Sequence, residues 1–120
     1  MFKGKFLAYF FIVIISLSVT SCSKYQRILK STDMEKKYEA AVNYYNEGDY
    51  FRASTIFESL IGVFRATKKA EKIYYYYAYC HFNQRNYYEA SFHFENFVKT
   101  FSNSEYAEEC QFMIAYCYYL

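Results

Sequence analysis

Three stretches of the chain repeat one pattern at a spacing of 37 residues: Ala41-Val-Asn-Tyr-Tyr-Asn-Glu-Gly-Asp-Tyr50, Ala78-Tyr-Cys-His-Phe-Asn-Gln-Arg-Asn-Tyr87 and Ala115-Tyr-Cys-Tyr-Tyr-Leu120. The first two stretches continue to match beyond their ends, with Tyr50, Ala53, Phe57 and Leu60 corresponding to Tyr87, Ala90, Phe94 and Phe97. These positions are three or four residues apart, which places them on one face of a helix. Self-similarity at this period is typical of a helical solenoid.

The composition also favours helices. The 120 residues include 17 Tyr and 13 Phe, but three Gly and no Pro. The rings supply large areas for burial, and a chain with so few turn-forming residues does not suit a many-stranded sandwich or barrel. We therefore expect an all-α fold with helices at about 33–47, 50–65, 69–84, 87–101 and 104–120. Capping-box spacing supports three of the starts, at Thr32 with Glu35, Asn86 with Glu89 and Ser102 with Glu105.

The repeated positions resemble those of the tetratricopeptide repeat. A small residue stands midway along the first helix of each pair, at Ala41, Ala78 and Ala115, and an aromatic residue follows three later, at Tyr44 and Tyr118. Gly48 suits the left-handed end of one helix, and Asp49 suits the start of the next. The chain departs from the pattern where His81 replaces the aromatic residue and Arg85 replaces the glycine. The closing proline is also missing, and the period exceeds the usual length of about 34 residues.

The N-terminal segment has the features of a secretory signal. Lys3 and Lys5 precede the apolar run Phe6-Leu-Ala-Tyr-Phe-Phe-Ile-Val-Ile-Ile15, which is short for a transmembrane span. The following Val19-Thr20-Ser21-Cys22 resembles the lipobox of bacterial lipoproteins, in which the cysteine thiol accepts the lipid. We expect a lipoprotein signal peptide at 1–21, a flexible lipidated tail at 22–31 and repeats over 32–120. The alternative is an ordinary signal peptide followed by a chance cysteine.

The residues after Cys22 bear on which membrane holds the protein. Gram-negative lipoproteins retained in the inner membrane usually carry Asp after the lipidated cysteine, whereas this chain has Ser23. Residues 23–26 contain no acidic run, so they do not resemble the surface-export signal of some lipoproteins. We therefore expect a lipid anchor in the outer membrane, through Cys22, on the periplasmic face.

Charge and motifs exclude several classes of function. Once Lys3 and Lys5 leave with the signal peptide, the basic and acidic residues balance. A chain without a basic excess lacks the electrostatic footprint of a nucleic-acid-binding protein. No glycine-rich phosphate loop, Gly-x-Ser-x-Gly, Cys-x-x-Cys or His-Glu-x-x-His motif occurs in the sequence. We expect a non-enzymatic protein without a cofactor.

The remaining cysteines suit a core better than a disulfide or a metal site. Cys110 and Cys117 are seven residues apart on one expected helix, about 10 Å, which is too far for a disulfide. Cys80 and His81, beside Cys110 and Cys117, resemble a zinc set only in residue type, because adjacent side chains on a helix point about 100° apart. We expect buried thiols and no metal site.

The repeat register places a row of aromatic residues on the first helix of each pair, which lines the concave groove in tetratricopeptide arrays. We call this set the aromatic stripe; Asn46 and Asn83 follow it and could hydrogen-bond an extended peptide. The alternative is that the rings pack between repeats or under a later helix. The stripe consists of Tyr38, Val42, Tyr45, Tyr75, Tyr79, Phe82, Phe112, Tyr116 and Tyr119.

Together, the lipobox, the short tail and the repeats resemble the BamD (YfiO) family over residues 19–120. The segment from Phe97 to Ala107 resembles that family's loop Phe-Pro-x-Ser-x-Tyr-Ala, with Ser102 in place of the proline. The resemblance implies a non-enzymatic subunit of the machinery that folds β-barrels into the outer membrane. Its implied partners are the other assembly subunits and the aromatic-ended targeting segments of unfolded barrel proteins.

Two further expectations concern the whole protein. The sequence stops at Leu120, inside the last expected helix and after about two and a half repeats, so we expect it to be the N-terminal part of a longer protein. The alternative function is that of another tetratricopeptide envelope lipoprotein, either a cell-envelope coordinator or a glycan-binding protein of nutrient uptake. An envelope enzyme would need a catalytic domain after residue 120.

Overall fold

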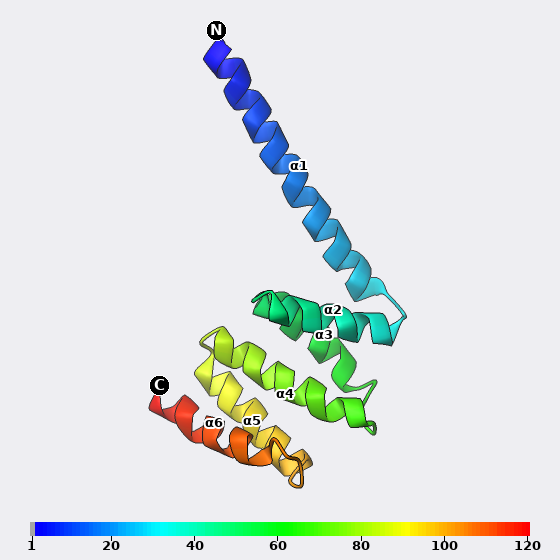
Figure 1. The fold of residues 1–120 in the computed structure, drawn as a ribbon, viewed down its shortest axis with the longest axis vertical. Coiled ribbons are helices and arrows are strands. Elements are labelled where there is room, and N and C mark those ends of the chain that lie inside the picture. The colour runs from blue at the N-terminus through cyan, green and yellow to red at the C-terminus, as the bar shows by residue number, and fades with distance from the viewer. Residues whose placement is uncertain (1) are drawn as a thin grey trace. The chain divides into compact units, whose positions relative to one another are not determined.

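The computed structural model describes the backbone of residues 2–120 and the side chains of residues 2–16 and 22–120. The chain divides into two compact units, Met1–Thr32 and Asp33–Leu120. Figure 1 shows the first unit as one long helix and the second as a series of shorter helices.

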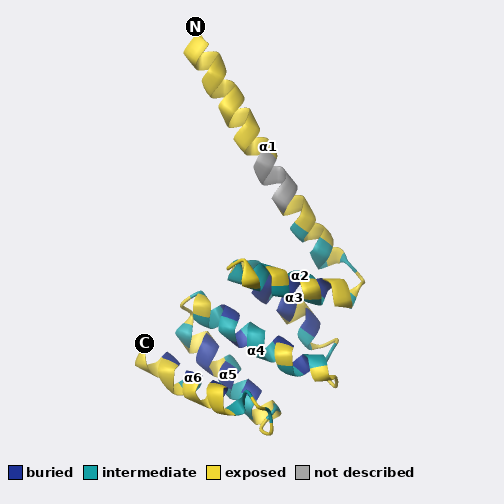
Figure 2. Ribbon diagram, in the orientation of Figure 1, coloured by how far each residue is buried: buried dark blue, intermediate teal, exposed yellow. Residues whose placement is uncertain are grey.

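The first unit is the helix α1, Phe2–Lys30. It includes most of the segment 22–31, where we expected a flexible tail. Its continuity has a simple origin, because neither Gly nor Pro occurs between Lys5 and Thr32. Its N-terminal half is exposed, as the yellow ribbon in Figure 2 shows. Among the described residues, no helix combines the length and apolar character needed to cross a bilayer.

The second unit contains five helices that follow one another along the chain. They are α2 (Met34–Asn46), α3 (Tyr50–Ile61), α4 (Lys68–Asn83), α5 (Tyr87–Thr100) and α6 (Ala107–Tyr119). Each helix packs against the next one, and no strand forms within residues 2–120. The expected fold class, an all-α solenoid of the tetratricopeptide type, is confirmed.

Two helix boundaries differ by more than one residue from those expected. Helix α3 ends at Ile61 rather than near 65, because the chain turns at Gly62, a poor helix former. Helix α6 begins at Ala107 rather than near 104. There the hydroxyl of Ser104 accepts a hydrogen bond from the Tyr106 amide at 3.0 Å, which holds a turn before the helix.

Aspartate side chains cap both helices of the first repeat. Asp33 accepts a hydrogen bond from the Lys36 amide at 3.2 Å, so the expectation of a cap at Thr32 was wrong by one residue. Asp49 accepts from the Arg52 amide at 3.2 Å, as expected. Each bond satisfies one amide that the helix leaves without an internal partner.

The other two expected capping boxes do not form as such. Asn86 stands at the N-cap of α5, but its side chain makes no capping hydrogen bond. The N-cap of α6 is Tyr106, so the expected cap at Ser102 was wrong. Ser102 lies instead in the turn that separates α5 from α6.

The core is built from the repeated small and aromatic positions. Figure 2 shows it in dark blue along the facing sides of the helices. The paired positions of the first two repeats are fully buried: Ala41 and Ala78, Ala53 and Ala90, Phe57 and Phe94, Leu60 and Phe97. The third repeat departs from this rule, since Ala115 is exposed. Helix α6 packs chiefly against α5 and does so through another face, with Cys110, Met113 and Cys117.

The turns within the two repeats require the same left-handed backbone. Gly48 has a φ of 81°, and Arg85, at the equivalent position 37 residues later, has a φ of 63°. Glycine adopts this conformation freely, whereas a side chain there costs about 1–2 kcal/mol. The second repeat therefore has a strained turn where the first has a relaxed one.

Exchanging the two residues should change stability in opposite directions. We expect Arg85→Gly to raise the free energy of unfolding by about 0.5–1 kcal/mol, because strain relief exceeds the entropy that glycine loses. Gly48→Arg should lower it by about 1 kcal/mol through the backbone alone, since no atom lies within 4 Å of a Cβ built there. Denaturant titration measures both changes. Equal effects of the same sign would contradict this account.

Candidate functional site

The aromatic stripe is half-buried on α2 and α4. Tyr45 packs against Tyr76 at 4.9 Å and Tyr38 against Phe57 at 6.4 Å between ring centroids. Burial raises the pKa of Tyr45 to about 12. Tyr45 therefore joins the first repeat to the second, and Tyr38 packs within the first repeat. Packing between repeats was the alternative to a free binding face.

On α4, two tyrosines of the stripe share one acceptor from α6. The hydroxyls of Tyr75 and Tyr79 both donate to the same carboxylate oxygen of Glu109, the first over 2.9 Å. Burial and this carboxylate raise the pKa of both phenols. Glu109 itself is exposed on α6. Its place three residues before Phe112, on the same helical face, is the signal that would have included it in the stripe.

The stripe opens to solvent on α6. Phe112 is 65% exposed, Tyr116 38% and Tyr119 83%. Their rings stack in turn, with centroids 5.9 Å and 6.4 Å apart and interplanar angles of 16° and 15°. Phe82 of α4 continues the row at 5.9 Å from Tyr116. Within the described residues, the stripe thus ends in an exposed aromatic ladder, which consists of Phe112, Tyr116 and Tyr119.

The remaining member of the stripe, Val42, and the two asparagines expected to follow it differ in burial. Val42 is half-buried, whereas Asn46 and Asn83 are exposed. Asn83 lies beside the Tyr45 hydroxyl and lowers its pKa, against the larger effect of burial. Asn46 and Asn83 thus lie at the surface beside the row of rings, as the register predicts.

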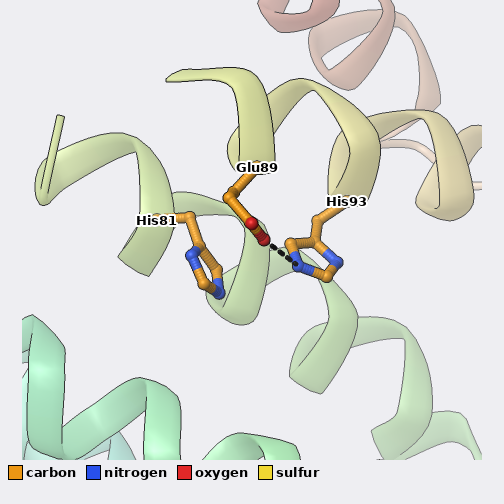
Figure 3. Close-up of side chains that lie close together, drawn as sticks. All are labelled: His81, Glu89 and His93. Carbon is orange, nitrogen blue, oxygen red and sulfur yellow. Dashed lines mark ion pairs between the residues drawn. The ribbon is translucent and has the colours of Figure 1, made fainter. Parts of the chain in front are cut away.

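A second group of polar side chains converges where α4 meets α5 (Figure 3). The donor atoms of His81, Glu89 and His93 all lie within 4.8 Å of one another. Glu89 and His93 are four residues apart on α5, and His93 Nε2 is 3.9 Å from Glu89 Oε2. The centroids of the two imidazole rings are 4.7 Å apart, and the Tyr77 ring contacts both. Three potential metal ligands from two helices therefore share one place.

Burial makes both imidazoles neutral at physiological pH. It lowers the pKa of His93 to about 4 and also lowers the pKa of His81. Neither ring nitrogen of His81 has a hydrogen-bond partner among the described residues. Sequence reasoning considered His81 with the cysteines and missed Glu89 and His93. The available signal was the four-residue spacing of Glu89 and His93, which places both on one face of α5, together with His81 in the last turn of the preceding helix.

The cysteines occupy the core, as expected. Cys80, Cys110 and Cys117 are free and buried, and none of them joins the histidine cluster. Burial raises the pKa of Cys80 and of Cys110 to about 12 and also raises that of Cys117. They are packing thiols that resist ionisation.

The raised thiol pKa values make stability depend on alkaline pH. Unfolded cysteines ionise near pH 8.5, so the stabilising effect of the protonated thiols is complete below that pH and declines as pH rises toward 12. We expect the urea midpoint to fall between about pH 8 and 10. The fall should be smaller in a Cys80→Ala, Cys110→Ala variant, and an identical fall in both proteins would contradict the assignment.

The expected lipid-attachment residue lies on α1. Cys22 is exposed there. The side chains of Val19, Thr20 and Ser21, which complete the expected lipobox, lie outside the described residues.

The fold and the row of rings define a helical repeat protein with an aromatic face. Residues 30–120 match the YfiO family, described as outer membrane lipoprotein, and the chain belongs to this family. The resemblance noted from the sequence is thereby confirmed. Comparison with curated proteins gave no match.

Proposed function

We propose that this lipoprotein is a non-enzymatic subunit of the machinery that inserts β-barrels into the outer membrane. The observation that carries the proposal is the exposed ladder on α6, which continues the half-buried stripe of α4. Exposed apolar patches of this kind are costly in water and usually mark a binding surface. The proposed ligand is an extended, aromatic-ended segment of an unfolded barrel protein, and the proposed partners include the other assembly subunits.

The chemistry of the ladder suits such a ligand. Stacked rings present flat apolar faces at low entropic cost, because each ring has few rotatable bonds. An aromatic side chain at the end of a peptide could extend the stack beyond Phe112 or Tyr119, which are both more than half exposed. The nearby carboxylate of Glu109 is already engaged by Tyr75 and Tyr79, so it holds the α4 and α6 parts of the stripe together.

Membrane attachment is assigned to lipid on Cys22, with the repeats on the periplasmic face. Support comes from the exposed thiol and from the family, whose description is that of an outer membrane lipoprotein. Several acyl chains hold a protein far more firmly than one. Anchoring would keep the ladder close to the membrane into which barrels insert.

Removal of the thiol tests the anchor. We expect Cys22→Ser to abolish lipid labelling and to move the protein out of the outer-membrane fraction, because no other residue is assigned to the lipid. Membrane fractionation with labelled fatty acid measures this, and Cys80→Ser serves as a control that leaves the attachment residue intact. A mature, unlabelled Cys22→Ser protein in the outer membrane would disprove lipid anchoring.

Truncation of the ladder tests peptide binding. We expect Phe112→Ala with Tyr119→Ala to weaken binding of an aromatic-ended barrel peptide about thirtyfold, or about 2 kcal/mol, if the two rings are hot spots. The titration uses the full chain in detergent, with a scrambled peptide for comparison. Both rings are largely exposed, so the variant should melt like the wild type.

A matched control removes two other exposed rings. Phe51 and Tyr88 occupy equivalent positions on α3 and α5 and are 68% and 83% exposed. Phe51→Ala with Tyr88→Ala should bind the peptide as the wild type does. Equal affinity for both peptides, or equal losses in the two double variants, would refute the ladder as the binding surface.

A further inference from the structure

We propose that His81, Glu89 and His93 form a binding site for a zinc-like divalent transition-metal ion that links α4 to α5. The donor atoms come from the end of one helix and the beginning of the next, and all lie within 4.8 Å of one another. Figure 3 shows the Glu89 carboxylate between the two imidazoles. The site is separate from the aromatic ladder and does not depend on the function proposed for it.

The geometry requires little rearrangement. Two ligands at about 2.0–2.1 Å from a zinc ion are about 3.4 Å apart in a tetrahedral site. The donor atoms lie within 4.8 Å of one another, so their separations exceed this value by at most about 1.4 Å, and the 3.9 Å between Glu89 and His93 exceeds it by about 0.5 Å. Rotation of the Glu89 side chain, which is 61% exposed, can supply much of that closure.

The unpartnered nitrogens of His81 point to a missing ligand. Buried polar atoms nearly always have a hydrogen-bond partner, and an unsatisfied one costs about 1–3 kcal/mol. Both nitrogens of His81 are buried, and neither has a partner in the described part of the chain. A metal ion bound to one of them would offset this cost and would also neutralise the carboxylate of Glu89.

The repeat itself shows that ordinary packing does not require these residues. The equivalent positions in the first repeat are Tyr44, Arg52 and Ile56, none of which forms a ligand set. The second repeat has the same helices and core but carries a ligand type at all three positions. The second repeat therefore differs from the first at all three of these positions, which the fold brings together.

The donor set selects the class of metal. Two imidazoles and one carboxylate suit zinc and its neighbours among the transition metals, whereas magnesium and calcium prefer sites made of oxygen. Three protein ligands leave a fourth position for water. The site belongs to two packed helices, so bound metal should stabilise the second repeat.

The experiment measures binding of Zn²⁺ and Co²⁺ to the unprocessed full chain in detergent, without a polyhistidine tag. The exposed thiol of Cys22 is alkylated first, which removes a competing ligand while the other cysteines are buried. We expect one ion per chain, a melting temperature that rises with Zn²⁺, and Co²⁺ absorption without a sulfur charge-transfer band. Excess Mg²⁺ should not displace the bound ion.

Variants based on the first repeat keep the test independent of misfolding. His81→Tyr and His93→Ile introduce the residues that the equivalent positions already carry, and Glu89→Gln removes only the charge. Each should weaken Zn²⁺ binding at least tenfold with metal-free melting unchanged, while the exposed Glu108→Gln on α6 should have no effect. Absence of one-to-one binding, a sulfur charge-transfer band, or full affinity in all three variants would overturn the proposal.

Discussion

Close approach of helices at their alanine positions is the constraint on which the rest of the structure depends. Ala41, Ala53, Ala78 and Ala90 have no exposed surface, so α2 to α5 each present a small buried residue that lets neighbouring helices approach closely. Large rings then fill the spaces on either side of these residues, as where Phe57 and Tyr76 stack 5.5 Å apart at 5°. Replacing the small residues with large ones would displace both the helices and the rings.

The same register that builds the core also produces the two surfaces of interest. Alanine fixes the inward face of α4, whereas Cys110, Met113 and Cys117 form that of α6. Ring contacts join residues beside these faces into a row from Tyr75 through Tyr79, Phe82 and Tyr116 to Tyr119. Along this row the exposure increases toward α6, from rings that join repeats to rings that reach solvent. The His81 cluster lies at another repeated position, so one scaffold carries two chemically different sites.

Much of the fold could be predicted from the sequence, because it follows from local rules. The 37-residue spacing identified the core pairs, and Gly48 and Asp49 marked the turn within the first repeat. The boundaries that were missed depend on weak signals. Gly62 follows the end of α3 in an αR conformation, and the residues around it do not predict that the helix stops there. The turn at Ser104 moves the start of α6 to a later residue than expected.

The candidate sites were predictable only in part, because their chemistry depends on contacts between helices. Periodicity placed Tyr75 and Tyr79 on one face, but their burial and shared bond to Glu109 depend on a residue at least 30 positions away. The histidine cluster likewise requires the end of α4 to meet the first turns of α5. Helix geometry could exclude a metal site made of neighbouring residues on one helix. It could not show which residues of two different helices come together.

The packing of each helix against its sequence neighbour has a mechanical consequence. Between α4 and α6 the interactions of the aromatic row are made by long side chains, namely the Tyr75 and Tyr79 hydrogen bonds to Glu109 and the Phe82 contact with Tyr116. Such links tolerate small changes in helix spacing better than backbone-close crossings do. The spacing between neighbouring helices should therefore change little at the buried alanines, whereas the spacing between α4 and α6 along the row of rings should change more easily.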